Sequence, residues 1–309
     1  MLEIMRLSIC FFILIWALNT AWANDIVTIY KAQFKTEDEV LDFIVREYIP
    51  IISLERPYDR EQMKQNLKMW NPHIKDWTAI TVQTKINVYK KRYLYDLHFG
   101  YHTYDNTEKL PGNGAINTKN FGPTMSLRIT RTKDINAFTY YEYRLLKKND
   151  FRLLDNNKLY SFPANHNLEM GYNWGPRRSN WSLGFGLAYE QISYLSFNNE
   201  RFRVKSIILD NLQVSTVESF WATADLNYRI PFIPYGTYLS LQYGHSLWAK
   251  KSLDDGSLEE TMSGQKLEGS LKFYFWRQMW FKIYYLSIFT SANTQIDHTQ
   301  IGTHLGVTF

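Results

Sequence analysis

Cysteine and proline are scarce in this chain of 309 residues, and long apolar runs are confined to its start. Cys10 is the only cysteine and lies inside the apolar run from Leu7 to Leu18, which excludes disulfides and cysteine-based metal sites. No segment after residue 23 offers the ~18 apolar residues that a membrane-spanning helix needs. The net charge of +5 comes without a basic run that interleaves aromatics, so we expect no nucleic-acid partner.

The N-terminus has the pattern of a secretory signal peptide. Arg6 precedes the apolar run, and Ala21-Trp22-Ala23 follows it as an A-x-A cleavage pattern. The run is short for a membrane anchor. We therefore predict that residues 1–23 are a signal peptide, removed after Ala23.

Large apolar side chains alternate with small or polar ones along residues 92–309. In "RYLYDLHFGYHTY", Leu97 and Phe99 fall on one face of a strand, whereas His98 and His102 fall on the other. The pattern recurs and predicts about ten strands of roughly ten to twelve residues. At ~3.3 Å per residue and a tilt of ~40°, eleven residues span about 28 Å, close to the hydrocarbon core of a bilayer.

The chemistry of the two faces indicates which one points outward. The polar face carries small residues and charges, as a crowded lumen requires, and the apolar face carries large aromatics. Only a closed barrel lets strands present such a face to lipid, because an open edge would leave backbone groups unpaired. We therefore predict an all-β transmembrane antiparallel barrel, with a soluble all-β sandwich as the alternative. Ile301, Leu305 and Val307 should contact lipid, and Phe309 should end the last strand at the interface.

The connections between these strands are predicted to alternate in length. Long gaps are expected at 105–120, 149–165, 191–216, 249–265 and 290–297, and short turns at "TKDIN", "GPRRSN", "PFIPY" and "WRQ". Aromatics beside the short turns predict an interfacial girdle, formed by Trp174, Trp181, Tyr228, Trp276 and Trp280. In these features residues 92–309 resemble bacterial outer-membrane β-barrels. That resemblance implies outer-membrane lipid and the barrel assembly machinery as partners, the latter through the terminal Phe309.

Residues 24–91 lose the alternation and show helix signals instead. A capping box from Thr36 to Glu39 opens "TEDEVLDFIVREY", and Asp59 is expected to cap "DREQMKQNLKMW". A strand-like "IVTIYKA" precedes these helices and "TKINVY" follows them. The predicted order is β-α-α-β, a small periplasmic domain ahead of the barrel.

The second half of this domain, "LKMWNPHIKDWTAITVQTKINVY", resembles a LysM module: a helix, Asn-Pro, a short loop, an apolar pair and a final strand. LysM modules bind glycans that contain N-acetylglucosamine, in bacteria chiefly peptidoglycan. The resemblance implies a shallow sugar groove between the loop before the first helix and the loop after the second. The candidate glycan-binding residues are Thr36, Asp38, Asn71, Pro72, Ile74 and Trp77. Trp77 is preferred over Trp70 for stacking on a sugar, because Trp70 lies on the apolar face of its helix.

Together these features favour a non-enzymatic tether, whose barrel lies in the outer membrane and whose periplasmic domain binds peptidoglycan. A domain that packs under the barrel or binds a protein is the alternative for residues 24–91. No cofactor, catalytic residue or metal site is expected.

The alternatives for the barrel are an enzyme or a narrow pore. Omptin-like proteases are ten-stranded barrels, and Asp297-His298 offers an acidic residue beside a histidine; a lipid-modifying enzyme is the related possibility. His98, His102, His298 and His304 are expected to line the seam where the first strand meets the last. Against an open pore, charges of both signs are expected to form salt bridges across the lumen. They are Glu142, Arg144, Glu169, Glu190, Arg229, Glu268, Lys272 and Lys282.

Overall fold

A computed structural model describes most of the chain after residue 21. The described residues are 22–28, 34–48, 57–81, 83–91, 93–109, 115–132, 137–152, 159–176, 179–197, 212–230, 236–253, 259–275, 279–292 and 294–308. The predicted signal peptide lies outside them, except for Trp22 and Ala23, with which the first strand begins. Trp276 and Phe309 also lie outside the described residues.

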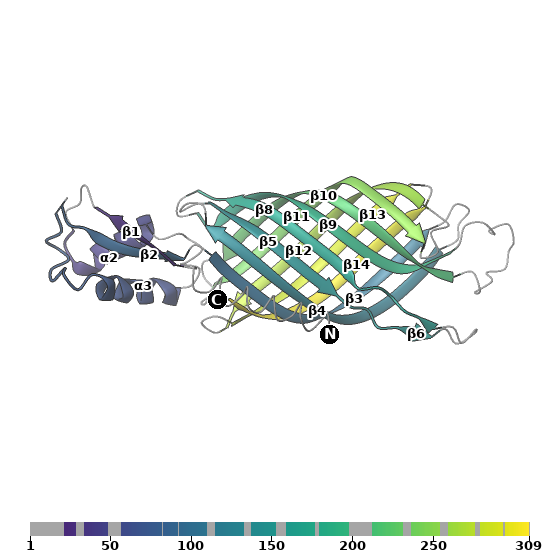
Figure 1. Cartoon of the computed structure of the whole chain (residues 1–309), viewed down its shortest axis with the longest axis horizontal. Coiled ribbons are helices and arrows are strands. Elements are labelled where there is room, and N and C mark those ends of the chain that lie inside the picture. The colour runs from purple at the N-terminus through teal and green to yellow at the C-terminus, as the bar shows by residue number, and fades with distance from the viewer. Residues whose placement is uncertain are drawn as a thin grey trace, which may run out of the picture.

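The elements form an N-terminal domain followed by a barrel (Figure 1). The domain contains β1 (Trp22–Val27), α2 (Glu37–Tyr48), α3 (Pro57–Trp70) and β2 (Ile86–Lys91). The barrel strands are β3 (Tyr93–Lys109), β4 (Ala115–Thr132), β5 (Ala137–Leu146), β8 (Asn165–Trp174), β9 (Trp181–Phe197), β10 (Leu212–Ile230), β11 (Thr237–Leu253), β12 (Glu259–Tyr274), β13 (Met279–Ser291) and β14 (Gln295–Thr308). A hairpin of β6 (Phe151–Arg152) and β7 (Leu159–Tyr160) lies between β5 and β8. None of the helices described combines the length and apolar character that membrane crossing requires.

The N-terminal domain has the predicted β-α-α-β order. β1 and β2 pair antiparallel, from Trp22 opposite Lys91 to Val27 opposite Ile86. The first strand begins earlier than "IVTIYKA" predicts, whereas the second overlaps "TKINVY". Only Arg92 separates β2 from β3, so the domain continues directly into the first strand of the barrel.

The two helices begin at different kinds of cap. The predicted capping box of α2 is confirmed: Thr36 Oγ1 accepts the N–H of Glu39 at 3.3 Å, and the Glu39 carboxylate accepts the N–H of Lys35 at 2.8 Å. The predicted cap at Asp59 is wrong, because α3 begins at Pro57. Proline has a fixed φ and no N–H, both of which suit the first position of a helix.

One face of each helix packs on the β1–β2 sheet and forms the core of the domain. Its buried residues are Val40, Leu41, Ile44, Val45, Met63, Leu67, Trp77, Ile86 and Val88. The predicted helical spacing of Met63 and Leu67 is thus confirmed, and Trp70 packs against this core from a partly buried position.

Ten antiparallel strands close into a barrel in the order β10-β11-β12-β13-β14-β3-β4-β5-β8-β9, as predicted (Figure 1). The closing seam joins β14 to β3, with Thr308 opposite Asp96 and Gln295 opposite Lys109. Because β3 begins where β14 ends, the N-terminal domain, the end of β14 and the short turns share one end of the barrel. We call it the turn end and the opposite one the loop end.

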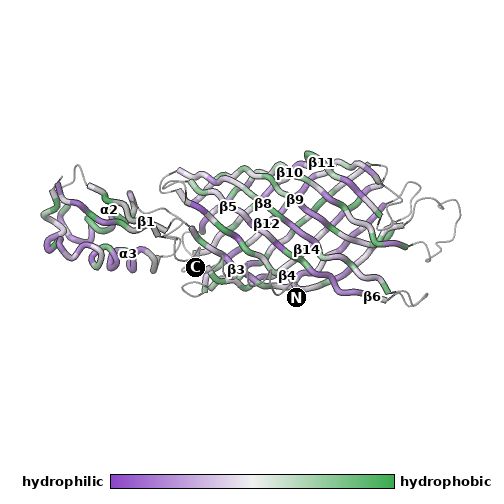
Figure 2. Tube along the Cα trace, viewed as in Figure 1, coloured by the Kyte–Doolittle hydropathy of each residue, from purple (hydrophilic) through white to green (hydrophobic). Residues whose placement is uncertain are grey.

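Side chains alternate between the two faces of the wall as predicted, and Figure 2 shows the alternation along the strands. On β14, Ile301 and Leu305 are 55% and 49% exposed on the outer surface, whereas His304 is 1% exposed in the lumen. Large side chains such as Phe99 and Phe185 are likewise exposed outside. The barrel therefore has an apolar exterior and a polar interior, the arrangement that a transmembrane barrel requires.

Strand length and loop length differ from the prediction. β10 has 19 residues and β4 has 18, well beyond the ten to twelve expected. Three predicted long loops shrink to 110–114, 254–258 and 292–294, because the flanking strands continue through them. The gap 147–164 holds the small β6–β7 hairpin. Beyond the membrane neither face of a strand contacts lipid, so polar and apolar residues alternate less regularly there. The sequence therefore predicted loops where the strands in fact continue.

The predicted aromatic girdle is confirmed at Trp174, Trp181 and Tyr228, which are 40–45% exposed, but it is wrong at Trp280. Trp280 is 2% exposed and points into the lumen. It lies two residues from the inward-pointing Lys282, and side chains two apart in a strand share a face. The alternation of side chains along the strand was thus sufficient to predict that Trp280 points inward.

Candidate functional site

Asn71, a candidate for glycan binding, serves as an internal clamp of the N-terminal domain. Its side chain is fully buried. The amide nitrogen donates to the carbonyl oxygens of Leu67 at 2.8 Å and Asn87 at 2.9 Å, and the amide oxygen accepts the N–H of Asn87 at 2.7 Å. Both amide hydrogens are used, so this side chain joins the end of α3 to β2 and has no donor left for a sugar.

The expected exposure of Trp77 is also wrong. Trp77 is 3% exposed and belongs to the core with Leu67 and Val88. Two short helices on two strands bury little apolar area. The core of such a domain therefore recruits an apolar side chain from a loop as well, and a tryptophan in the loop does not stay exposed. Trp77 supplies part of that area, so stacking on a ligand needs another side chain.

The other candidates lie near the surface at a common end of the two helices. Thr36, Asp38 and Pro72 are exposed, and Ile74 is partly exposed. Lys68, near the end of α3, pairs with Glu37 at the start of α2 at 3.1 Å, which brings the two predicted loops together. In the loop after α3, the hydroxyl and backbone N–H of Thr78 donate to Asp76 and lower the pKa of that exposed carboxyl.

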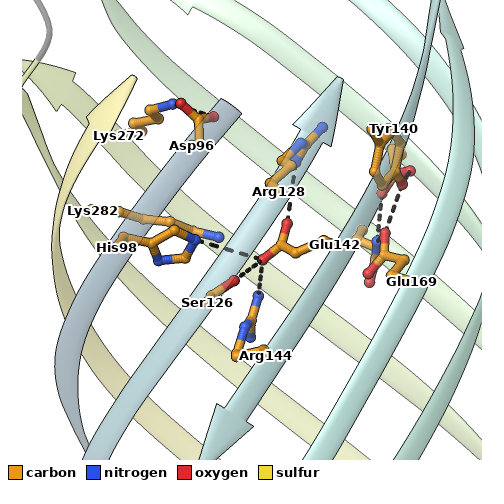
Figure 3. Close-up of polar contacts among 12 residues, drawn as sticks. Asp96, His98, Ser126, Arg128, Tyr140, Glu142, Arg144, Glu169, Lys272 and Lys282 are labelled. Atoms are coloured by element: carbon orange, nitrogen blue, oxygen red, sulfur yellow. Dashed lines mark hydrogen bonds and ion pairs between the residues drawn. The ribbon is translucent and has the colours of Figure 1, made fainter. Parts of the chain in front are cut away.

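Charged side chains fill the middle of the barrel lumen, as predicted (Figure 3). Glu142 lies at the centre of the cluster: it is within 3.4 Å of Arg128 and 3.2 Å of Arg144, and Ser126 donates to it at 3.2 Å. Arg144 also reaches Glu268 across the lumen at 3.4 Å, and Glu268 pairs with Lys282 at 3.3 Å. This cluster ties β4, β5, β12 and β13 together from the inside.

A pair of carboxylates lies beside this cluster. Tyr140 donates from its hydroxyl toward Glu169 at 2.6 Å and Asp225 at 2.9 Å, and the amide nitrogen of Gln242 contacts the same two carboxylates at 2.7 and 2.8 Å. A hydroxyl has one hydrogen, so it can donate to only one of the two carboxylates at a time. Tyr140 and Gln242 therefore hold the two carboxylates of Glu169 and Asp225 close to the same donors.

The closing seam is lined by the four predicted histidines, each 3% exposed or less. His98 and His304 face each other with their Nδ1 atoms 2.8 Å apart, and His98 Nε2 is 4.0 Å from Glu142. His298 bonds Asn106 at 2.5 Å. Within the described residues, no three potential ligands among His, Asp and Glu gather as a metal site.

The protease-like pair suggested by Asp297 and His298 is wrong. Asp297 points out of the lumen and pairs with Lys109 at 2.9 Å, whereas His298 is buried inside. Neighbouring residues of a strand point to opposite faces, so these two cannot act on one substrate atom. Ser126 does not complete a triad either, because its hydroxyl donates to Glu142 and its side chain is buried.

Ion pairs continue toward the loop end of the barrel. Lys251 pairs with Glu108, and Lys266 lies 3.4 Å from Glu190. Lys148 donates to the carbonyl of Ser193 and lies 4.1 Å over the ring of Tyr104. Sequence reasoning missed Lys251 and Glu108, since it assigned both to loops or loop borders. Inward parity along β3 is the signal that identifies Glu108. On β11 a register shift between His245 and Ala249 reverses the parity, so alternation alone would place Lys251 outside.

At the turn end the lumen opens into a cavity of about 200 Å³. Arg128, Glu142 and Lys282 form its inner border and separate it from a polar recess of about 60 Å³ that also touches Glu169 and Asp225. Trp280 and Lys272 form part of its wall. Side chains leave this part of the lumen unfilled.

We compared the chain with known families, curated proteins and solved structures. No protein-family model matches the sequence, and no curated protein matches it. Among solved structures, the outer-membrane protease OmpT from Escherichia coli aligns with 10% identity, over 70% of this chain and 96% of that chain, with a TM-score of 0.43. An outer-membrane channel from Pseudomonas putida F1 aligns with 10% identity over 70% and 95% of the two chains, with a TM-score of 0.40. Ail from Yersinia pestis aligns with 12% identity over 71% and 99%, with a TM-score of 0.31.

Proposed function

We propose that this protein is an outer-membrane tether, whose barrel anchors the β-α-α-β domain in the periplasm, where the domain binds peptidoglycan. The observation that carries the proposal is the direct connection of the two parts, with only Arg92 between β2 and β3. A domain joined so closely to the first strand stays at the membrane surface. An even number of strands puts both ends of the barrel chain on that same side.

The β-α-α-β order supports the resemblance to LysM modules, and the buried candidates change which residues would contact a glycan. Asn71 and Trp77 hold the domain together, so the groove consists of the exposed residues beside them. Thr36 and Asp38 flank it on one side, and Pro72 and Ile74 on the other. Carbonyl and N–H groups of the loop after α3 would bind the N-acetyl groups of the sugar.

Co-sedimentation of the full chain with insoluble peptidoglycan, in a neutral detergent, tests this proposal. We expect saturable binding that N-acetylglucosamine oligomers compete away. The double variant Asp38→Ala/Pro72→Ala should weaken binding, because both positions are exposed at the groove. Gln65→Ala, an exposed position on α3 outside both loops, is the matched control.

Far-ultraviolet circular dichroism at 222 nm checks that each variant keeps its helices. A folded wild-type chain that does not co-sediment saturably would overturn the glycan proposal. Saturable binding that the double variant retains would move the site away from the groove while leaving the tether in place.

A further inference from the structure

Cationic side chains form a row across four neighbouring strands at the turn end of the barrel. In the strand register, Arg229 of β10 lies opposite Tyr238 of β11, Tyr238 opposite Lys272 of β12, and Lys272 opposite Lys282 of β13. Residues directly opposite each other share a face of the sheet, and all four line the cavity of about 200 Å³. Three of the four positions in this cationic row are therefore positive.

Like charges directly opposite in a sheet are destabilising, so the row needs negative partners. Lys272 has Asp96 at 3.4 Å, and Lys282 has Glu268 at 3.3 Å. Arg229 has no carboxylate within 4.0 Å in the part of the chain that the structure describes. Arg229 lines the cavity, and its predicted ion pair across the lumen is not found among these described residues.

The balance of charge around the cavity agrees with this. Four cations of the described residues line it: Arg128, Arg229, Lys272 and Lys282. Among the described residues two carboxylates line it, those of Asp96 and Glu142. Glu142 is already held by Arg128 and Arg144, so it cannot also neutralise Arg229. Arg128, Lys272 and Lys282 each have a carboxylate partner, so Arg229 is the cation that a bound anion would balance among the described residues of this wall.

Aromatic rings and small side chains provide the rest of the wall. Lys272 lies 4.2 Å over the Trp280 ring and 4.9 Å over the Tyr274 ring, which fixes both rings beside the cationic row. Tyr238 meets Tyr274 edge-on, with ring centroids 6.3 Å apart. Ser240 and Ser270, opposite each other on β11 and β12, leave open the space that larger side chains would fill.

From this arrangement we propose that the cavity binds a small organic anion, with one carboxylate at Arg229 and a compact apolar body in the open space beside Ser240 and Ser270. A cavity of ~150 Å³ holds one benzene ring, so 200 Å³ suits a single ring that bears a carboxylate. A guanidinium matches a carboxylate with two parallel hydrogen bonds. This site is separate from the glycan groove, so either proposal can fail without the other.

Equilibrium dialysis of radiolabelled benzoate against the full chain in neutral detergent tests the site. We expect saturable binding of one benzoate per chain. Benzamide has the same shape without the charge and should compete at least about tenfold less well, because it cannot form the ionic bonds to Arg229.

Two variants address the charge and the space separately. Arg229→Gln should weaken benzoate binding about tenfold or more. Arg131→Gln is the matched control, because Arg131 is exposed at the same end of the barrel but does not line the cavity. Ser270→Phe keeps every charge and fills the cavity, and it should abolish binding.

The migration shift on heating in gel electrophoresis shows whether each variant forms a barrel. Absence of saturable benzoate binding to the folded wild-type chain would overturn the proposal. Equal loss of binding in Arg229→Gln and Arg131→Gln would do the same, since it would reflect overall charge alone. If Ser270→Phe does not fold, the comparison of the two arginine variants decides.

Discussion

Replacing Asn71 with alanine should unfold the N-terminal domain at a much lower temperature while the barrel stays intact. Asn71 makes three hydrogen bonds to backbone groups of Leu67 and Asn87, and all three disappear in the variant. The groups left behind are two carbonyl oxygens and one N–H, near a core that excludes water. The Asn71 side chain therefore contributes more to the stability of the domain than its size suggests.

The magnitude follows from the count of lost bonds. A buried hydrogen bond contributes about 0.5–1.5 kcal/mol net, so three contribute roughly 3 kcal/mol to the free energy of unfolding. In a domain of 60–100 residues, 1 kcal/mol shifts the midpoint of thermal unfolding by about 4–8 °C. We therefore expect the midpoint of the N-terminal domain to fall by roughly 12–24 °C.

Circular dichroism at 222 nm isolates this domain within the full chain, because both helices that the structure describes belong to it. Asn66→Ala is the control: Asn66 also lies on α3, and among the described residues its side chain bonds only Gln62, at 3.1 Å, on the same helix. A melting midpoint for Asn71→Ala within about 2 °C of the Asn66→Ala midpoint would refute the clamp. It would also restore Asn71 as a residue free to serve a ligand.

Three further predictions concern other parts of the chain. Burial lowers the pKa of the Lys64 ammonium, but hydrogen bonds to Asp38 and Glu61 outweigh this and raise the pKa above its usual value. The stability advantage of wild type over Lys64→Met, measured by urea unfolding at 222 nm, should therefore persist below pH ~10.4 and disappear as the pH rises through the raised pKa. Arg144→Met removes a partner from both Glu142 and Glu268, and should destabilise the barrel by about 3–5 kcal/mol in urea unfolding monitored by the heat-dependent gel shift. Gly302→Ala should cost about 1–3 kcal/mol in the same assay, because its Cβ would overlap the buried Tyr284 ring, whereas Gly269→Ala has open space and should change little.

Much of the barrel could be predicted because alternation carries the information residue by residue. The outward position of Ile301 and the inward position of His304 follow from parity alone, and so does the gathering of histidines where β3 meets β14. The same rule, applied consistently, would have placed Trp280 inside the lumen and Asp297 outside it. Those two errors came from reading neighbouring residues as a local motif.

Other features depend on geometry that a single strand does not contain. The reach of Arg144 from β5 to Glu268 on β12 depends on the diameter and stagger of the closed barrel. The burial of Asn71 and Trp77 depends on how little other apolar area the small domain can bury. Sequence reasoning placed Asn71 and Trp77 in the loop after the second helix, but it could not show that both side chains are buried.

The distribution of charge along the lumen indicates binding at the turn end more than passage through the barrel. A solute that moved inward from the cavity would meet the Arg144–Glu268 bridge and then the Lys266–Glu190 pair. Separating one buried pair costs about 3–5 kcal/mol when a partner is lost, and a solute would have to compensate for each in turn. The cavity, in contrast, is lined by Arg229, which has no carboxylate within 4.0 Å among the described residues. We therefore expect an anion that enters the cavity to leave by the same end, so that its occupancy reports the solute composition of the compartment that contains the N-terminal domain.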